Sequence, residues 1–161
     1  MPQTTYRTVM PVAIEGAIAD DGAIDVESRV NTGVSEIPFG RPVKAETIAA
    51  GVDKGCLLAA ASTDVPIGIA AHSHSNTVEE LGTSGMKTGA MVNVLRHGRI
   101  RVKAGDTIDD GQRLYYQTST GKWVVAAVAL DTIDMTAQVI ARSSGVLNDL
   151  IIAEVDMSNK S

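Results

Sequence analysis

Aromatic side chains are scarce in this sequence, where Phe, Trp and Tyr together make up 3% of 161 residues. Sites that stack nucleic acid bases, and platforms that bind sugars, both favour exposed aromatic rings, so neither kind of site is expected. The core must instead be built from Val, Ile, Leu and Ala. Because small side chains bury little apolar area each, this composition also indicates that contacts between subunits add to stability.

Cysteine, basic charge and long apolar runs are lacking too. The single cysteine, Cys56, excludes an intrachain disulfide and a zinc site built from several cysteines. A net charge of −5 offers no broad basic field for a phosphate backbone. No apolar run approaches the roughly 20 residues of a membrane-spanning helix. We therefore expect no nucleic acid partner and no membrane partner.

What is present indicates a folded chain. Apolar residues make up 44% and charged residues 20%, a balance too apolar and too weakly charged for intrinsic disorder. The first residues lack the basic stretch followed by an apolar stretch that marks a secretory signal, so we expect an intracellular origin.

Residues 1–40 are predicted to form an extended N-terminal arm. Pro2, Pro11 and Pro38 lie among small residues, and the dispersed apolar residues fit no amphipathic helix. An arm of this length needs a surface to lie on, either its own barrel or a neighbouring chain. Its apolar anchors are expected to be Tyr6, Val9, Met10, Val12 and Ile14.

Residues 41–161 are predicted to form a β-barrel domain. Short apolar segments recur at spacings of roughly 8–12 residues with turn signals between them, as in antiparallel barrels and sandwiches. One or two short helices are expected, at residues 44–51 and as a turn at 78–81. The predicted strands are 57–60, 66–72, 91–96, 98–103, 112–117, 122–130, 136–142 and 150–157. The fold class is therefore all-β: an antiparallel β-barrel or sandwich with an extended arm.

The clearest strand pattern runs from residue 98 to residue 103. Alternation places Ile100 and Val102 inward and turns the basic side chains outward. An exposed basic line on an acidic chain fits an acidic partner surface, and a solvated strand face equally well. The line consists of Arg96, Arg99, Arg101 and Lys103.

A metal site would have to be built on His72 and His74, which share one face of a strand. A third ligand would come from Asp64, Glu79 or Glu80. Alternation at the end of a polar strand gives the same histidine spacing without any metal, and we predict none.

No pattern predicts catalysis or a cofactor. Cys56 stands in Lys-Gly-Cys-Leu-Leu, which is typical of a small core residue at a strand start. Residues 82–88 are superficially similar to a phosphate-binding loop but lack its Gly-Lys-Ser/Thr ending. Residues 102–114 resemble half of a biotinyl or lipoyl carrier barrel, yet Lys122 is followed by Trp123 and not by the usual Met or Ala.

Two passages carry a more extensive resemblance: Ile37-Pro38-Phe39-Gly40-Arg41 and Val94-Leu95-Arg96-His97-Gly98-Arg99-Ile100. They are specific in combination. Further landmarks are residues 17–20, 31–33, 66–74, 105–106 and 114–116. Over nearly its whole length the chain resembles the structural cement, or capsid decoration, proteins of tailed bacteriophages.

That resemblance implies a protein made in the host cytoplasm that binds the outer surface of the assembled head. It would bridge neighbouring major capsid protein subunits and stabilise the shell without catalysis. Residues 1 to about 25 would then carry contacts between subunits. Self-association is also implied, with a homotrimer favoured and with a dimer, or a monomer clamped by the coat, left open.

Two other functions stay open. A tail- or head-associated carbohydrate-binding or adhesin module would use a β-barrel as well, although five aromatic residues suit it poorly. A barrel-type hydrolase would need a convergent polar site, and only the region of His72 and His74 offers one.

Overall fold

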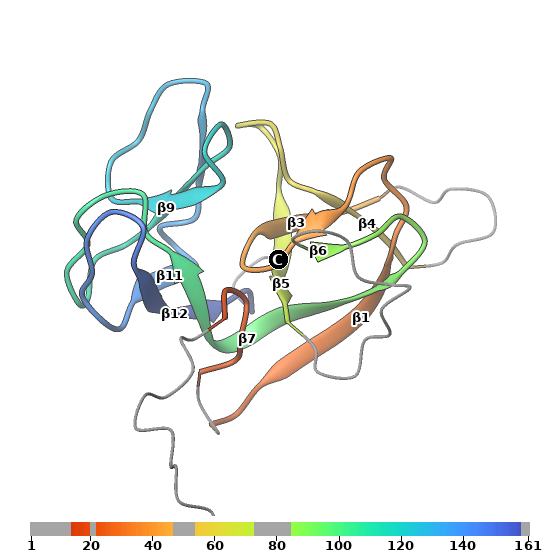
Figure 1. Ribbon diagram of the computed structural model, residues 1–161, viewed down its shortest axis with the longest axis horizontal. Coiled ribbons are helices and arrows are strands. Elements are labelled where there is room, and N and C mark those ends of the chain that lie inside the picture. Colours follow the sequence, from red (N-terminus) through yellow and green to blue (C-terminus); the bar gives the residue numbers. More distant parts are fainter. Residues whose placement is uncertain (1–13, 20–21, 47–53, 73–84, 159–161) are drawn as a thin grey trace, which may run out of the picture.

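The structure, a computed structural model, describes residues 14–19, 22–46, 54–72 and 85–158. These ranges form twelve β-strands and contain no helix, which confirms the predicted all-β class (Figure 1). Within the same ranges there is accordingly no helix long and apolar enough to cross a membrane.

Five strands close a barrel, as predicted. They are β1 (Asp25–Asn31), β4 (Gly55–Leu58), β3 (Pro42–Ala45), β5 (Pro66–Ala71) and β7 (Met91–Lys103). Neighbours pair in that order, and β7 pairs back with β1 to complete the circle. All of these pairs are antiparallel except β1 with β4, which is parallel.

The remaining strands form a second lobe and a short ribbon. The long strand β7 leaves the barrel and pairs with β12, which pairs with β11 (Figure 1). A separate three-stranded sheet has the order β10-β8-β9, and β2 pairs with β6. The bounds are β2 Ile37–Pro38, β6 Gly85–Met86, β8 Tyr115–Gln117, β9 Lys122–Val124, β10 Thr132–Asp134, β11 Val139–Ala141 and β12 Leu150–Asp156.

Two buried clusters lie on opposite faces of β5 and β7. Ala70 belongs to the first cluster, while its neighbours Ile69 and Ala71 belong to the second, as the alternation of a strand requires. The first fills the barrel, because its members come from β3, β4, β5 and β7: Val43, Cys56, Ala70, Val92 and Val94, with Ile37, Phe39, Met86 and Ala90. The second joins the barrel wall to the C-terminal strands and includes Ile100, Val102, Tyr116, Trp123 and Ile151.

A β-bulge in β7 lets one strand serve both cores. Val26 pairs with Leu95 while the adjacent Asp25 pairs with His97, so Arg96 is an extra residue opposite β1. One extra residue reverses the alternation of side chains. Ile100 and Val102 are consequently fully buried, as predicted.

Gly98 allows β7 to continue beyond the bulge. Its φ is +133°, and a Cβ there would lie 2.9 Å from Cγ2 of Ile24. Side chains are rarely found in this conformation, so the position requires glycine. The two strands predicted on either side of Gly98 are therefore one bent strand of 13 residues.

Several predicted elements differ from the structure. The strand predicted at residues 122–130 ends at Val124, and β10 was not predicted. The helix predicted at residues 44–51 is wrong at its N-terminal end, because Lys44 and Ala45 belong to β3. Residues 47–51 of that segment, and the helical turn at 78–81, lie outside the described residues.

The predicted arm is shorter than 40 residues, since Asp25–Asn31 is β1 of the barrel. The preceding residues 14–19 lie on the chain's own barrel. Gly16 N donates to Arg101 O at 2.7 Å, Arg101 N donates to Ala17 O at 2.9 Å, and His72 N donates to Gly16 O at 2.8 Å. For this stretch the structure follows the alternative of an arm packed on its own domain. Tyr6, Val9, Met10 and Val12 lie outside the described residues.

Candidate functional site

The candidate interaction surface lies where the arm and the start of β1 run along β7. We call it the arm–β7 face. Ile18 forms a bridge with Ile100 of β7, and further along the chain Val26 pairs with Leu95. Four aliphatic side chains of this stretch stay exposed: Ile14 (50%), Ile18 (36%), Ile24 (50%) and Val26 (37%). Three of them precede β1 and one lies in it, and several exposed aliphatic side chains gathered in one stretch are a feature of protein interfaces.

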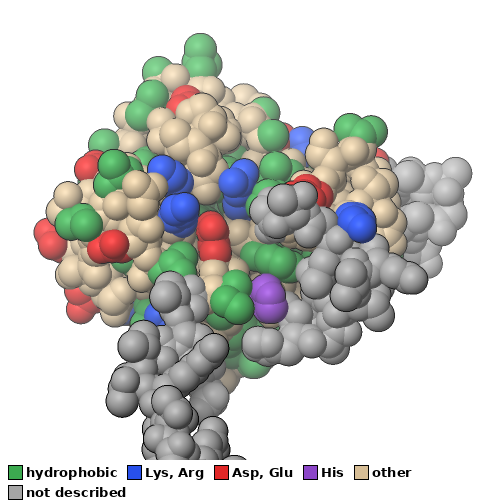
Figure 2. All heavy atoms as spheres, viewed as in Figure 1, with side chains coloured by type: hydrophobic (Ala, Val, Ile, Leu, Met, Phe, Trp, Pro, Cys, Tyr) green, Lys and Arg blue, Asp and Glu red, His purple; other side chains and the backbone are tan. Residues whose placement is uncertain are grey.

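The predicted basic line is interleaved with carboxylates. Arg99 Nε lies 3.2 Å from Glu154 Oε2, and Arg142 donates two hydrogen bonds of 3.0 Å to the same carboxylate. The hydrogen bond from Arg142 lowers the pKa of Glu154. Partial burial acts against this effect, and Arg99 adds to it. On the face shown in Figure 2, basic and acidic side chains likewise lie close together.

Arg96, also on β7, has a similar setting beside Glu27 of β1. Its Nη1 lies 4.0 Å from Glu27 Oε2, and Lys54 and Arg29 lie 3.1 and 3.2 Å from the same carboxylate. The structure therefore presents Arg96 and Arg99 as members of ion-pair networks with exposed donors. A partner surface would meet a mixed pattern of charge, which adds specificity more than affinity.

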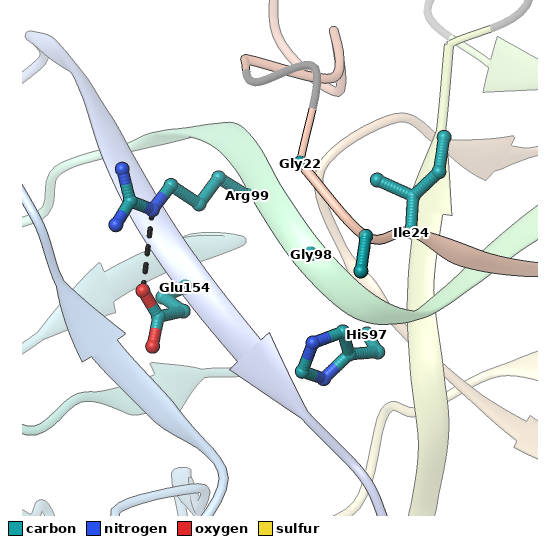
Figure 3. Close-up of a pocket in the computed structure, with 7 residues that line it drawn as sticks. Gly22, Ile24, His97, Gly98, Arg99 and Glu154 are labelled. Carbon is teal, nitrogen blue, oxygen red and sulfur yellow. Dashed lines mark hydrogen bonds and ion pairs between the residues drawn. The ribbon is translucent and has the colours of Figure 1, made fainter.

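A small pocket opens between the arm and these charges. Its volume is about 220 Å³, and Figure 3 shows the Arg99–Glu154 ion pair on one side and Ile24 on the other. One wall is thus ionic and the other aliphatic, which suits the side chain of a neighbouring protein. The lining residues are Gly22, Ala23, Ile24, His97, Gly98, Arg99 and Glu154.

Arg101 and Lys103 are half-buried, and both lie at the docking site of the arm. The backbone of Arg101 makes the hydrogen bonds that hold residues 16 and 17. Burial raises the pKa of Glu15 and outweighs the opposite effects of Arg41 and Lys103. Glu15 packs over Gly40, where a Cβ would lie 2.7 Å from its Cγ. Backbone hydrogen bonds therefore hold the arm on the barrel, and docking there leaves the Glu15 carboxyl group partly desolvated.

Glu15→Gln tests this arrangement through the pH dependence of stability. Because the pKa of Glu15 is raised in the folded state, the stabilisation gained on protonation is complete below the ordinary pKa of a glutamate and is lost as the pH rises through the folded-state pKa. The melting temperature of the variant, relative to wild type, is therefore expected to be higher at about pH 7 than at about pH 4. Thermal unfolding at both pH values measures this, with Asp25→Asn as the exposed-carboxylate control. An equal difference at both pH values would contradict the prediction.

The metal hypothesis finds no support among the described residues, which contain no group of three or more potential ligands. The Asp64 carboxylate accepts hydrogen bonds from Lys44 Nζ at 2.8 Å and from the backbone of Ala60 and Ala61 at 2.9 Å. The ring of His72 packs against Phe39 with centroids 4.8 Å apart. His74, Glu79 and Glu80 lie outside the described residues.

Cys56 is a core residue, as its sequence context indicates. It is fully buried inside the barrel, and burial raises the pKa of its thiol to about 11. A thiol with that pKa is protonated near neutral pH and is a poor nucleophile.

Sequence reasoning missed the partners of the arginines and the pocket beside them. Glu154 is 55 residues from Arg99 in the sequence, and only the pairing of β7 with β12 brings them together. Ile24 stands in the predicted arm but was not among the expected anchors. Its position before an alternating segment was the available signal.

Comparisons with protein families and with solved structures both found matches to this chain. The model of a family described as "Structural cement protein (E217 gp24/Pam3 gp6)" matches residues 2–155. A chain from the capsid of Myoviridae phage XM1 has the same fold, with a TM-score of 0.65 and 17% identity over 96% of this chain and 98% of that one. A chain from the head fiber gp8.5 N base of bacteriophage phi29 has a TM-score of 0.44 and 12% identity, over 84% of this chain and 96% of that one. No curated protein matches.

Proposed function

Because the chain belongs to the structural cement protein family, as the match over residues 2–155 shows, we propose that it binds the outer surface of an assembled phage head and bridges neighbouring major capsid protein subunits. Family membership itself makes it a structural, capsid-associated phage protein. The bridging role is the step beyond that membership, and the exposed aliphatic side chains of the arm–β7 face are the observation that supports it.

Mass action explains how such a protein would strengthen a shell. A molecule that binds only the assembled state lowers the free energy of that state relative to free subunits. When one molecule contacts two subunits at once, the second contact forms at high effective concentration, so individually weak contacts suffice. This role needs neither catalysis nor a cofactor.

The arm–β7 face is the surface we assign to the capsid contact. Ile14 is half exposed where the described arm begins, and Tyr6, Val9, Met10 and Val12 remain the proposed anchors before it. Arg96 and Arg99 are exposed on β7, Arg101 is half-buried there, and the three would meet polar groups at the rim of the contact. Self-association as a homotrimer, or as a dimer, would multiply these contacts.

The test is co-sedimentation of the full chain with shells assembled from the major capsid protein. The chain is expected to pellet with assembled shells and to raise their thermal disassembly temperature, because it binds the assembled state. Unassembled capsid protein, captured on a surface, is the control and is expected to bind more weakly. Absence from the shell pellet would contradict the proposal, and retention on glycans alone would favour the adhesin alternative.

A further inference from the structure

The loop between β9 and β10 exposes an unbroken apolar segment, residues 126–130, which we call the apolar loop. Its sequence is Ala-Ala-Val-Ala-Leu, and all five residues are exposed. Val128 is 45% exposed and Leu130 is 91% exposed. Because neither buried cluster uses these side chains, their apolar character contributes nothing to the two cores.

The loop is anchored firmly at its C-terminal end by Asp131. Its carboxylate accepts hydrogen bonds from Gln117 Nε2, Thr118 Oγ1 and Ser119 N at 2.8 Å, and from Ser119 Oγ at 2.6 Å. With four donors in place, this carboxylate is satisfied within the chain. The charge of Asp131 therefore holds the loop in place and does not serve as a contact for a partner.

A second set of hydrogen bonds closes the loop on itself. The Val128 carbonyl accepts from the backbone N of Asp131 and of Thr132, both at 3.1 Å. The Thr132 hydroxyl accepts a hydrogen bond from Val128 N and donates one to Val128 O, both at 3.0 Å. Fixed geometry of this kind reduces the conformational entropy lost when the loop binds a partner.

Leu130 occupies a backbone conformation that does not suit it. Its φ is +63°, in the left-handed region, and Asn148 is the other non-glycine residue with a positive φ in the part of the chain that the structure describes. Asn tolerates this region, whereas a larger side chain is strained there. Gly or Asn would therefore fit the backbone of Leu130 better, yet a Leu stands there and buries almost nothing. Strain held at an exposed position indicates a role outside the chain.

The size of the apolar loop indicates what kind of partner it meets. A stable interface between two proteins uses about 20–30 residues on each side, so five residues, three of them alanine, are too few to hold two copies of this chain together. A contact this small contributes when it is one of several made at the same time. Repeated contacts of this kind occur on an assembled shell.

We propose that the apolar loop is a second capsid contact, in which Leu130 enters an aliphatic-lined pocket of the assembled shell. This inference rests on the proposed function. In Figure 1 the loop stands at the top of the view, well away from residues 14–19, and Figure 2 shows hydrophobic side chains at that end. Two separated contact points are what a molecule needs to touch two subunits.

Leu130→Asn tests the proposal in the full chain. Removing the aliphatic side chain is expected to weaken shell binding about tenfold, which equals about 1.4 kcal/mol. The melting temperature is expected to stay the same or rise, because Asn accepts a positive φ. Co-sedimentation at a series of concentrations, together with thermal unfolding, measures both. Leu130→Gly provides a second variant with the same expected loss of binding.

Val34→Asn is the matched control, since Val34 is fully exposed and lies in the turn before β2. Its shell binding is expected to equal that of wild type. If wild type pellets with shells and Leu130→Asn pellets equally well, the apolar loop is not a contact, while the proposed function stands. If wild type itself does not pellet, the proposed function has failed. An equal loss in Val34→Asn, or a loss of self-association with shell binding unchanged, would also overturn the inference.

Discussion

Deletion of residues 1–13 is expected to weaken binding to capsid shells by at least about 100-fold, while the barrel and the C-terminal strands stay folded. The deleted stretch contains the proposed anchors Tyr6, Val9, Met10 and Val12. Full burial of one such side chain contributes about 1.5–3 kcal/mol. Even after the cost of ordering the arm, a net loss of about 3 kcal/mol corresponds to the expected factor.

The fold of the truncated chain can be checked separately, because both buried clusters lie between Ile37 and Met157. Its melting temperature is expected to match that of the full chain within a few degrees. Deletion of residues 159–161 serves as the control for shortening the chain, and it is expected to leave binding unchanged. Truncated protein that fills shells as well as wild type would show that the capsid contact lies elsewhere on the molecule.

The strand over residues 98–103 was the most predictable part of the fold. Alternation over residues 98–103 predicted the correct inward residues, Ile100 and Val102, because this part of the strand has one buried face. By contrast, β1 was assigned to the arm. Its pattern Asp-Val-Glu-Ser-Arg-Val-Asn leaves most side chains partly exposed, and its place depends on pairing with β4 and β7. Pairing between distant segments leaves no local signal of this kind.

The apolar run after Trp123 shows the opposite failure. Residues 122–130 have the apolar composition of a buried strand, and composition and periodicity alone do not show where such a strand ends. The structure ends β9 at Val124 and exposes residues 126–130 as the apolar loop. A composition that misled the fold prediction is therefore the feature that marks a second interaction surface.

The candidate site was predictable only in its cations. Arg96 and Arg99 are exposed on β7 as expected, but their carboxylate partners Glu27 and Glu154 come from β1 and β12. Charge pairing across strands depends on register, and register depends on the bulge at Arg96. The surface is consequently mixed in charge, which sequence spacing alone could not show.

Trp123→Ala is expected to lower the stability of the fold more than the substitutions at Glu15, Val34 or Leu130. The indole is fully buried and packs against Tyr116, with ring centroids 5.4 Å apart. Its Nε1 donates to the carbonyl oxygen of Gly40 at 3.0 Å, and its backbone oxygen accepts from Gly105 N at 2.7 Å. One residue of β9 thus contacts both the turn before β3 and the segment that follows β7.

Removing the ring would leave a cavity between the lobes and take away the partner of a buried carbonyl. The expected cost is about 3–5 kcal/mol, which lowers the melting temperature by about 10 °C in a chain of this size. Trp123→Phe keeps an aromatic ring but loses the hydrogen bond, so its cost is expected to be smaller, about 1–2 kcal/mol. Urea unfolding of the three proteins measures the difference. Equal stability of wild type and Trp123→Ala would mean that the C-terminal strands are held to the barrel by β7 and β12 alone.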